Sequence, residues 1–316
     1  MSNVIGLDIG GTNLRIGLMR DNLLERGEIF PSAEVLGAGD EITHLGALIE
    51  DFRGETPISA VSIGFPSSIS ADGKTVLNAA NLVKADGERA FSGKNLVDPL
   101  SKMLGAAVSL ERDANCLLYH DMHAPIANGE KMADADGIRA EGIFAGCYIG
   151  TGFGAAAMIN GAFLKGKHGS AMEAGHIPFY RSTSPCGCGK VGCAECYASG
   201  RAAKAMLDTH YPGLSFETVF RDHADDEPVS ALVEAIAVTA ATLVNIFDPH
   251  TLFLGGGVLS AEFPKEKLRA GIKRHALSPY PRDDLDIRFS RQDAFAGVIG
   301  AALYAGRMLT KTTTRL

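Results

Sequence analysis

The chain has 316 residues, of which 46% are hydrophobic and 21% charged, and its formal net charge is −7. This length allows two domains with substantial cores, and the negative charge argues against a nucleic-acid or membrane partner. The N-terminal MSNVIGLDIGG lacks the basic segment of a secretory signal peptide. Most of the six cysteines cluster at metal-site spacing, which suits a reducing compartment. We therefore expect a globular cytoplasmic protein.

The first predicted element is a β-hairpin close to the N-terminus. Val4–Asp8 is apolar and predicts a strand, and Leu14–Met19 predicts the returning strand. The turn between them supplies the residue types that tight turns require, which are Gly10, Gly11, Thr12 and Asn13.

Further elements are predicted from apolar runs that are bounded by polar or turn residues. They are strands at 61–65, 108–110 and 251–254, and helices at 116–123, 231–247 and 296–308, the last followed by a frayed tail. Glu234 and Asn245 interrupt the helix at 231–247, which favours a core helix over a membrane span. The polar stretches at 128–141 and 222–227 are expected to be surface loops.

The middle of the chain repeats the N-terminal pattern. A strand from Phe144 leads into a turn that contains Thr151 and Gly152, and Ala155–Ile159 predicts the returning strand. Two such hairpins, about half a chain apart, indicate an internal duplication with one hairpin in each domain. Backbone amides in glycine turns can bind phosphate. The two turns and a third glycine run, Gly255, Gly256 and Gly257, therefore predict a nucleotide site with three contact points.

A histidine and three cysteines predict a zinc site; they are His176, Cys186, Cys188 and Cys193. Interleaved glycines allow this segment to fold back tightly enough for the ligands to face one point. Four such ligands suit tetrahedral Zn²⁺ with no open position, so the metal would be structural. Two alternatives remain at this stage: a Cys₄ site that uses Cys196 in place of His176, and a redox or disulfide role. Cys116 and Cys147 are expected to be ordinary buried thiols.

Asp113 directly follows a short predicted strand. A carboxylate at this position could accept a proton from an attacking hydroxyl group, but aspartate also caps helix N-termini very often. Asn81, Glu173 and Glu195 are polar residues that could bind sugar hydroxyls, although each alone is more often a surface residue.

Five motifs together resemble the ROK family of sugar kinases and repressors. They are LDIGGTNLRIGL, ERDANC, YIGTGFGAAAMING, EAGH followed by CGCGKVGCAE, and FDPHTLFLGGGV, and they run from residue 4 to about 258 in the family's order. The resemblance implies an α/β fold of the actin-like ATPase (hexokinase, ribonuclease H-like) type with two domains and a cleft between them. We expect a small domain at 1–116, with the helix at 296–308 packed on it, and a large domain at 117–295.

The same resemblance implies an ATP-dependent kinase that uses Mg²⁺ and phosphorylates the 6-hydroxyl of a hexose, with Asp113 as the catalytic base. The γ-phosphate and Mg²⁺ would face Asp8 and the turn Gly10–Asn13, the other phosphates Thr151 and Gly152, and the adenosine Gly255–Gly257. The sugar would be held by Asn81, Arg112, Asp113, Glu173, His176 and Glu195. His176 would have two roles, with one ring nitrogen on zinc and the other toward the sugar. A homodimer is also expected, with a contact in the segment 201–230.

Arg112 departs from the family pattern, because most glucose-using members have asparagine directly before the catalytic aspartate. This favours a hexose that differs from glucose, and other segments resemble members that act on D-allose. Glucose, fructose and mannose are the alternative substrates. The family's repressors carry a helix-turn-helix region before the first strand, and only three residues precede Val4 here, so we expect an enzyme.

Overall fold

The computed structural model describes residues 3–35, 39–79, 82–84, 87–123, 141–179, 181–291 and 293–313, with side chains up to residue 307. The chain divides into two compact units. Unit 1 comprises Met1–Ile138, Lys165–Ala171 and Asp293–Leu316, and unit 2 comprises Arg139–Leu164 and Met172–Gln292.

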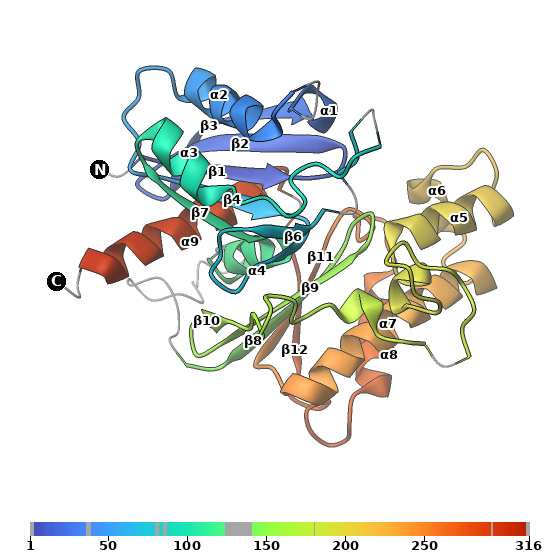
Figure 1. Ribbon diagram of the computed structural model, residues 1–316. Helices are drawn as coiled ribbons and strands as arrows, with labels where there is room; N and C mark the ends of the chain where they lie inside the picture. Colours follow the sequence, from blue (N-terminus) through green and yellow to red (C-terminus); the bar gives the residue numbers. More distant parts are fainter. Residues whose placement is uncertain are drawn as a thin grey trace. The chain divides into compact units, whose positions relative to one another are not determined.

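Unit 1 is built on a five-stranded sheet in the order β3-β2-β1-β4-β7 (Figure 1). Its strands are β1 (Asn3–Ile9), β2 (Asn13–Arg20), β3 (Leu23–Pro31), β4 (Ala60–Phe65) and β7 (Ala107–Arg112). The first three pair antiparallel, and β1, β4 and β7 are parallel neighbours. A two-stranded ribbon, β5 (Ser68–Ile69) and β6 (Val76–Asn78), accompanies this sheet.

Helices cover both faces of the unit 1 sheet. They are α1 (Ser32–Val35), α2 (Glu41–Arg53), α3 (Val97–Leu104), α4 (Asp113–His123) and α9 (Ala296–Thr313). Because successive side chains of a strand point to opposite faces, Ile5 and Leu7 of β1 belong to the large core that includes α2 and α3. Gly6 lies on the other face, against the carbonyl oxygen of Val298 in α9, where a Cβ atom would meet it at 2.2 Å. This close approach allows α9 to pack directly on β1.

Unit 2 is built on a second five-stranded sheet, in the order β10-β9-β8-β11-β12. Its strands are β8 (Ile143–Ile149), β9 (Phe153–Ile159), β10 (Ala162–Phe163), β11 (Thr251–Gly255) and β12 (Asp286–Phe289). Its helices are α5 (Gly200–His210), α6 (Phe216–Asp222), α7 (Glu227–Phe247) and α8 (Lys265–His275), with the short 3-10 helices η1 (Ala174–His176) and η2 (Ala194–Cys196). By length and composition α7 could cross a membrane, but 61% of its most apolar window is buried within the protein, as in a core helix.

The two sheets share one plan, as the predicted duplication requires. In each, an antiparallel hairpin (β1/β2 or β8/β9) continues into a third antiparallel strand on one side and two parallel strands on the other. The polar turns at 10–12 and 150–152 join the strands of the two hairpins. The duplication therefore places the two turns at corresponding positions of the two sheets.

Several predicted boundaries differ from the structure. Helix α4 begins at Asp113 and not at residue 116, so unit 1 continues through this helix, which packs on α9. Helix α9 continues to Thr313, where a frayed tail was expected. The acidic run at 222–227 is a loop only between Asp222, which ends α6, and Glu227, which begins α7. Of the loop predicted at 128–141, only residue 141 lies within the described residues.

Candidate active site and metal centre

Acidic side chains converge at the carboxyl ends of the parallel strands in unit 1. Asp8 of β1, Gly64 of β4 and Glu111 of β7 form one row of the sheet, so the two acidic side chains share a face. Cys116 of α4 packs over Gly64, whose Cβ position is 3.3 Å from its sulfur atom. Burial raises the pKa of this thiol, and the charges of Glu111, Asp8 and Asp113 raise it further. The charges of three carboxylates therefore act on one buried sulfur atom.

Asp8 is partly buried, with 21% of its side chain exposed, and lies 3.7 Å from the guanidinium of Arg15. Burial raises the pKa of Asp8, and the charge of Arg15 acts in the opposite direction. Gly297, at the start of α9, faces the Asp8 carboxylate closely enough for a Cβ atom to meet its carbon at 2.7 Å. The positive end of the α9 dipole favours a negative charge at this point.

The turn after Asp8 is tied to the start of α1. The amide of Gly10 donates to the carbonyl of Asn13 at 2.9 Å, which closes the turn. The Ser32 hydroxyl donates to the Gly10 carbonyl at 2.6 Å, and the Ser32 amide donates to the Thr12 carbonyl at 2.9 Å. Gly11 and Thr12 are exposed at the tip. Hydrogen bonds to the carbonyl groups of the turn therefore fix its position, and its tip faces solvent.

Asp113 is the first residue of α4 and is half-buried. Its Oδ1 accepts a hydrogen bond from the amide of Ala114 at 2.7 Å. This contact supports the helix-terminus role, and the same helix N-terminus stabilises the ionised carboxylate that a general base requires. The two interpretations of Asp113 are compatible, and its catalytic role stays a prediction.

Glu111 and Arg112, which precede Asp113, hold the two ends of the segment 165–171. Glu111 is 2% exposed; its carboxylate accepts from the Asn115 amide group at 2.8 Å and pairs with Lys165 Nζ at 2.6 Å. Arg112, which is 8% exposed, donates from Nη1 to the Ala171 carbonyl at 2.5 Å. Arg112 was expected to contact a sugar. The structure shows a contact with the backbone, and its sugar contact stays a prediction.

In unit 2, the second glycine turn lies beside the glycine run at 255–257. Gly255 of β11 pairs with Tyr148 of β8, and Gly256, at φ +97°, packs against the backbone of Ile149. Apart from the adjoining residues of the chain, no atom of the described residues lies within 4 Å of the Cβ positions of Gly150 and Gly257. Two glycines of this region therefore leave open space next to the main chain, as the approach of a ligand to the backbone requires.

The predicted metal ligands come together in unit 2. Four side chains each offer one ligand atom, and these atoms lie within 4.8 Å of one another; the residues are His176, Cys186, Cys188 and Cys193. The Sγ atoms of Cys188 and Cys193 are 3.6 Å apart, and Cys186 Sγ is 3.8 Å from His176 Nδ1. Zinc bonds of about 2.0–2.3 Å at tetrahedral angles separate ligand atoms by about 3.5–3.8 Å. The arrangement therefore fits tetrahedral zinc.

The Cys₄ site and the redox or disulfide role have less support in the structure than the four-ligand site of His176 and three cysteines. Cys196 is outside the group of four; its sulfur lies 3.6 Å from the Pro185 carbonyl oxygen and 3.7 Å from that of Ser184. All six cysteines are free thiols, so the structure contains no disulfide. Cys116 and Cys147 are buried, as expected, and burial raises the pKa of Cys147 to about 12.

The second ring nitrogen of His176 faces a carboxylate. Nε2 lies 3.9 Å from Glu173 Oε2, while Nδ1 faces Cys186. This orientation agrees with the two roles expected for the ring, one nitrogen on the metal and the other directed away from it. Glu173 and His176 are both half-buried, so solvent reaches the pair. Asn81, the remaining predicted sugar ligand from unit 1, lies outside the described residues.

Protein groups bond to both oxygens of the Glu195 carboxylate. Oε2 accepts a hydrogen bond from the amide of Phe153 at 3.0 Å, and Oε1 bonds to the guanidinium of Arg201. The side chain is 12% exposed. Sequence reasoning missed both contacts, because neither Phe153 nor Arg201 belongs to the motif that contains Glu195.

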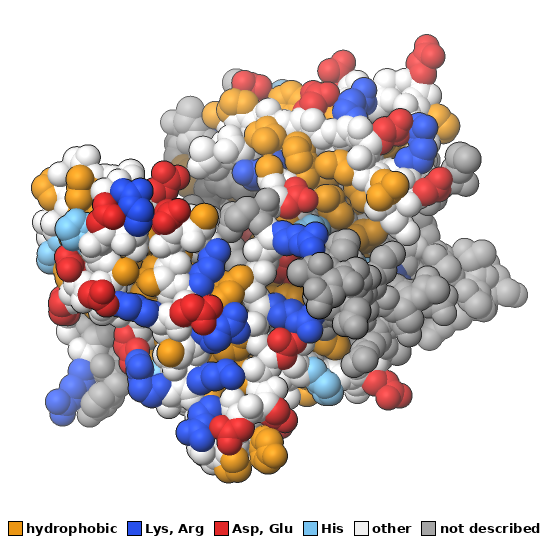
Figure 2. Space-filling view, turned by 180° about the vertical axis from the view of Figure 1, so that it is seen from behind, with side chains coloured by type: hydrophobic (Ala, Val, Ile, Leu, Met, Phe, Trp, Pro, Cys, Tyr) orange, Lys and Arg blue, Asp and Glu red, His pale blue; other side chains and the backbone are white. Residues whose placement is uncertain are grey.

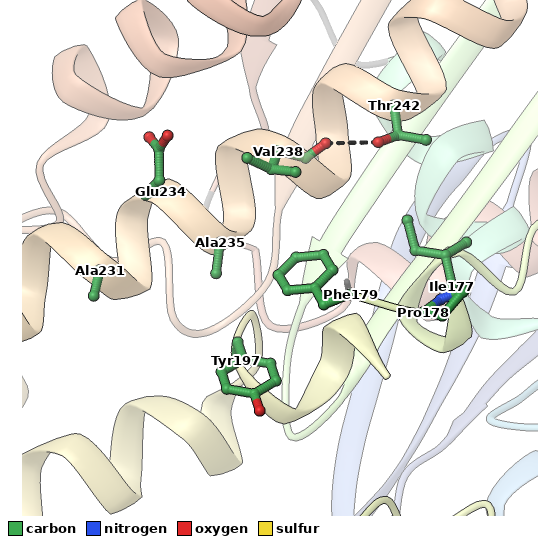
Figure 3. A pocket seen from close by; sticks show the side chains of 9 residues that line it. All are labelled: Ile177, Pro178, Phe179, Tyr197, Ala231, Glu234, Ala235, Val238 and Thr242. Atoms are coloured by element: carbon green, nitrogen blue, oxygen red, sulfur yellow. Dashed lines mark hydrogen bonds between the residues drawn. The ribbon is translucent and has the colours of Figure 1, made fainter. Parts of the chain in front are cut away.

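A pocket of about 670 Å³ lies between α7 and the segment that follows His176 (Figure 3). Its lining is mainly apolar and consists of Ile177, Pro178, Phe179, Tyr197, Ala231, Glu234, Ala235, Val238 and Thr242. The rings of Phe179 and Tyr197 stack with their centroids 5.8 Å apart. None of the predicted phosphate, sugar or metal ligands lines this pocket.

On the surface seen in Figure 2, acidic and basic side chains of the described residues are interspersed.

The chain is similar to known sugar kinases in sequence and in fold. The N-acetyl-D-glucosamine kinase of Vibrio vulnificus is 28% identical over 295 residues, which cover 86% of this chain and 90% of the relative. The ROK hexokinase of Thermus thermophilus superposes with a TM-score of 0.76 at 25% identity, covering 98% and 99% of the two chains. A ROK glucokinase of Streptomyces griseus, solved with glucose and AMPPNP, gives a TM-score of 0.73 at 24% identity, covering 96% and 99%.

These neighbours confirm the α/β fold of the actin-like ATPase type that the sequence motifs predicted. The model of the ROK family matches residues 4–307, which include both hairpins, the metal cluster and all three glycine segments. The chain therefore belongs to the ROK family.

Proposed function

We propose that this protein is an ATP-dependent hexose kinase that transfers a phosphoryl group to the sugar 6-hydroxyl. One observation carries the proposal: in a ROK-family chain, Asp8 lies near the end of β1 beside a glycine turn, and Asp113 directly follows β7 of the same sheet. Phosphoryl transfer depends mainly on positioning and on stabilising charge, which this arrangement of carboxylates and amides can supply.

In the proposed mechanism, Asp113 orients the 6-hydroxyl and accepts its proton. The tip of the turn at Gly10–Asn13 would face the γ-phosphate with backbone amides and the Thr12 hydroxyl. Asp8 would hold Mg²⁺, which neutralises charge on the transferring phosphate when bound. In unit 2, Thr151 and Gly152 would contact the remaining phosphates, and Gly255–Gly257 the adenosine.

The hexose would be bound by Glu173 and by Nε2 of His176, together with Asn81, Arg112 and Glu195. We propose D-allose as the substrate. The residue before Asp113 is an arginine, so the side-chain amide that binds glucose in other members is missing. The guanidinium of this arginine bonds to the Ala171 carbonyl. A guanidinium cannot replace that amide, because it donates hydrogen bonds but cannot accept them. N-acetyl-D-glucosamine, glucose, mannose and fructose are the competing acceptors.

Zinc would have a structural role at the four-ligand cluster. Four ligands would fill the tetrahedral positions of the ion and leave none for substrate; they are His176, Cys186, Cys188 and Cys193. The metal would fix the orientation of the His176 ring, and through it the nitrogen that faces Glu173.

The function is tested by coupled measurement of ADP release with D-allose, D-glucose, D-mannose, D-fructose and N-acetyl-D-glucosamine. We expect turnover that requires Mg²⁺ and the highest kcat/KM for allose. A higher kcat/KM for another hexose would refute the allose assignment alone, and no ATP turnover with any of them would refute the kinase proposal. The homodimer expected from the sequence stays a prediction that sedimentation analysis can test.

A further inference from the structure

We infer that Glu111 is a positioning residue for Asp113, because its side chain fixes the junction at which strand β7 passes into helix α4. This inference rests on the proposed function, in which Asp113 accepts the proton of the sugar hydroxyl. Arg112 ends β7 and Asp113 begins α4, so no loop separates the two elements. A general base must lie within hydrogen-bond reach of the proton that it accepts. The course of the main chain at this junction therefore decides where the Asp113 carboxylate lies.

Glu111 bonds to the chain on both sides of Asp113. Its Oε1 accepts from the backbone amide of Arg112 at 3.0 Å, directly before Asp113, and from the side-chain amide of Asn115 at 2.8 Å, two residues after it. Glu111, Arg112 and Asn115 are all buried. One buried oxygen atom therefore joins the last residue of the strand to the first turn of the helix. Hydrogen bonds to an ionised carboxylate are stronger than those between neutral groups, so this junction is firmly held.

The side chain of Asp113 is oriented by the same junction. Its Oδ1 accepts from the amide of Ala114 at 2.7 Å. Amides in the first turn of a helix have no partner within the helix, so this bond forms only while the Asp113 carboxylate faces the helix N-terminus. Glu111 fixes the main chain around Asp113, and the Ala114 bond fixes the carboxylate relative to that main chain. The two contacts together set the direction of the proposed base.

Lys165 supplies the positive charge that a buried carboxylate requires. Its Nζ lies 2.6 Å from Glu111 Oε2, the oxygen atom that takes no part in the bonds to Arg112 and Asn115. A buried carboxylate that has lost its cationic partner is strongly destabilising. Lys165 therefore allows Glu111 to hold the junction without adding an unpaired negative charge close to Asp113, which has to ionise in order to act as a base.

A double-mutant cycle tests whether Glu111 acts through Asp113. Glu111→Ala should lower kcat about tenfold, the scale of one charge-assisted hydrogen bond, with the KM for ATP within about twofold. In the background of Asp113→Asn, which already lacks the proton acceptor, the same change should lower kcat by less than about twofold. A tenfold loss in both backgrounds would overturn the inference, because Glu111 would then act independently of the base.

Two further variants separate positioning from a general loss of stability. Glu111→Gln keeps an oxygen atom that can accept from Arg112 and Asn115, so kcat should stay within about threefold of the unmodified protein. Glu41→Ala is the matched control, because Glu41 is also a buried glutamate of unit 1 that pairs with lysine and accepts from a backbone amide. It should lower the melting temperature and leave kcat within about twofold. Equal losses of kcat in Glu111→Ala and either of these variants would overturn the inference.

Hydrogen exchange supplies a readout that does not require turnover. The Ala114 amide bonds to the Asp113 carboxylate, so it should exchange faster in Glu111→Ala than in the unmodified protein and stay protected in Glu41→Ala. Unchanged protection in Glu111→Ala would overturn the inference directly. If the unmodified protein phosphorylates none of the hexoses, or if Asp113→Asn keeps a normal kcat, the proposed function or its base fails. The exchange measurement then still decides whether Glu111 positions Asp113.

Discussion

The two glycine turns occupy corresponding places in the two sheets, but different parts of the chain support them. The turn at 10–13 is tied to Ser32, through one hydroxyl and one amide hydrogen bond. The turn at 150–153 is held by Glu195, Gly200 and Arg201, and Glu195 belongs to the segment that carries the metal ligands. The two hairpins therefore have different kinds of support, and only that of the second should depend on the metal.

The largest effect is expected for Asp113→Asn, which removes the proposed base and leaves both turns intact. Asparagine keeps a side-chain oxygen that can accept from the Ala114 amide, so the melting temperature should change little. Loss of the proton acceptor should lower kcat by about 10²-fold or more. The matched control is Asp98→Asn, an exposed aspartate in the first turn of α3. Near-normal kcat in Asp113→Asn would leave this carboxylate with its helix-terminus role alone.

The next effect is expected for Cys188→Ser, which should affect the turn at 150–153 and leave the turn at 10–13 unchanged. Loss of one ligand should remove zinc and lower stability, because metal binding contributes directly to folding. The turn at 150–153 should then lose its support, with a rise in the KM for ATP of about tenfold. Cys147→Ala is the control, since this buried thiol of β8 is not a member of the cluster. Zinc-free protein, purified without chelators and fully active, would contradict the link.

A smaller effect is expected for Ser32→Ala, which acts on the other turn. The variant loses the hydroxyl bond to the Gly10 carbonyl and keeps the amide bond to Thr12. A neutral hydrogen bond of about 1 kcal/mol corresponds to a rise in the KM for ATP of about fivefold. Zinc content should not change. Ser59→Ala removes a similar hydroxyl-to-carbonyl bond, to Asn3, and should leave the KM for ATP unaltered; equal effects of both variants would argue against a special role of Ser32.

The features that sequence reasoning predicted are local in the chain. The hairpins follow from apolar runs around glycine turns, and the metal cluster from ligands within one stretch of 18 residues, from His176 to Cys193. The start of α4 was misplaced because strand β7 runs into the helix without a turn residue; the signal for the boundary was Asp113, whose residue type often marks a helix N-terminus.

The missed contacts join residues that are distant in sequence. The bond between Glu195 and the Phe153 amide spans 42 positions, and that between Arg112 and the Ala171 carbonyl spans 59. Both use backbone groups as partners, and backbone groups are the same at every residue. A pattern of side chains can therefore identify Glu195 and Arg112 as polar residues in a motif, but only the folded chain shows which backbone group each one holds.

The smallest effect concerns the carboxylate that precedes the first turn. Burial raises the pKa of Asp8 and the charge of Arg15 opposes this, so loss of the cation in Arg15→Gln should raise the pKa further. Because the ionised carboxylate is the form that binds a cation, activity should fall as the pH drops through this pKa. The acidic limb of kcat/KM should accordingly move to higher pH in Arg15→Gln. Arg20→Gln serves as the control, since Arg20 lies on the same strand and pairs with exposed Glu25. A limb that stays in place, or moves to lower pH, would show that Asp8 does not set the pH dependence.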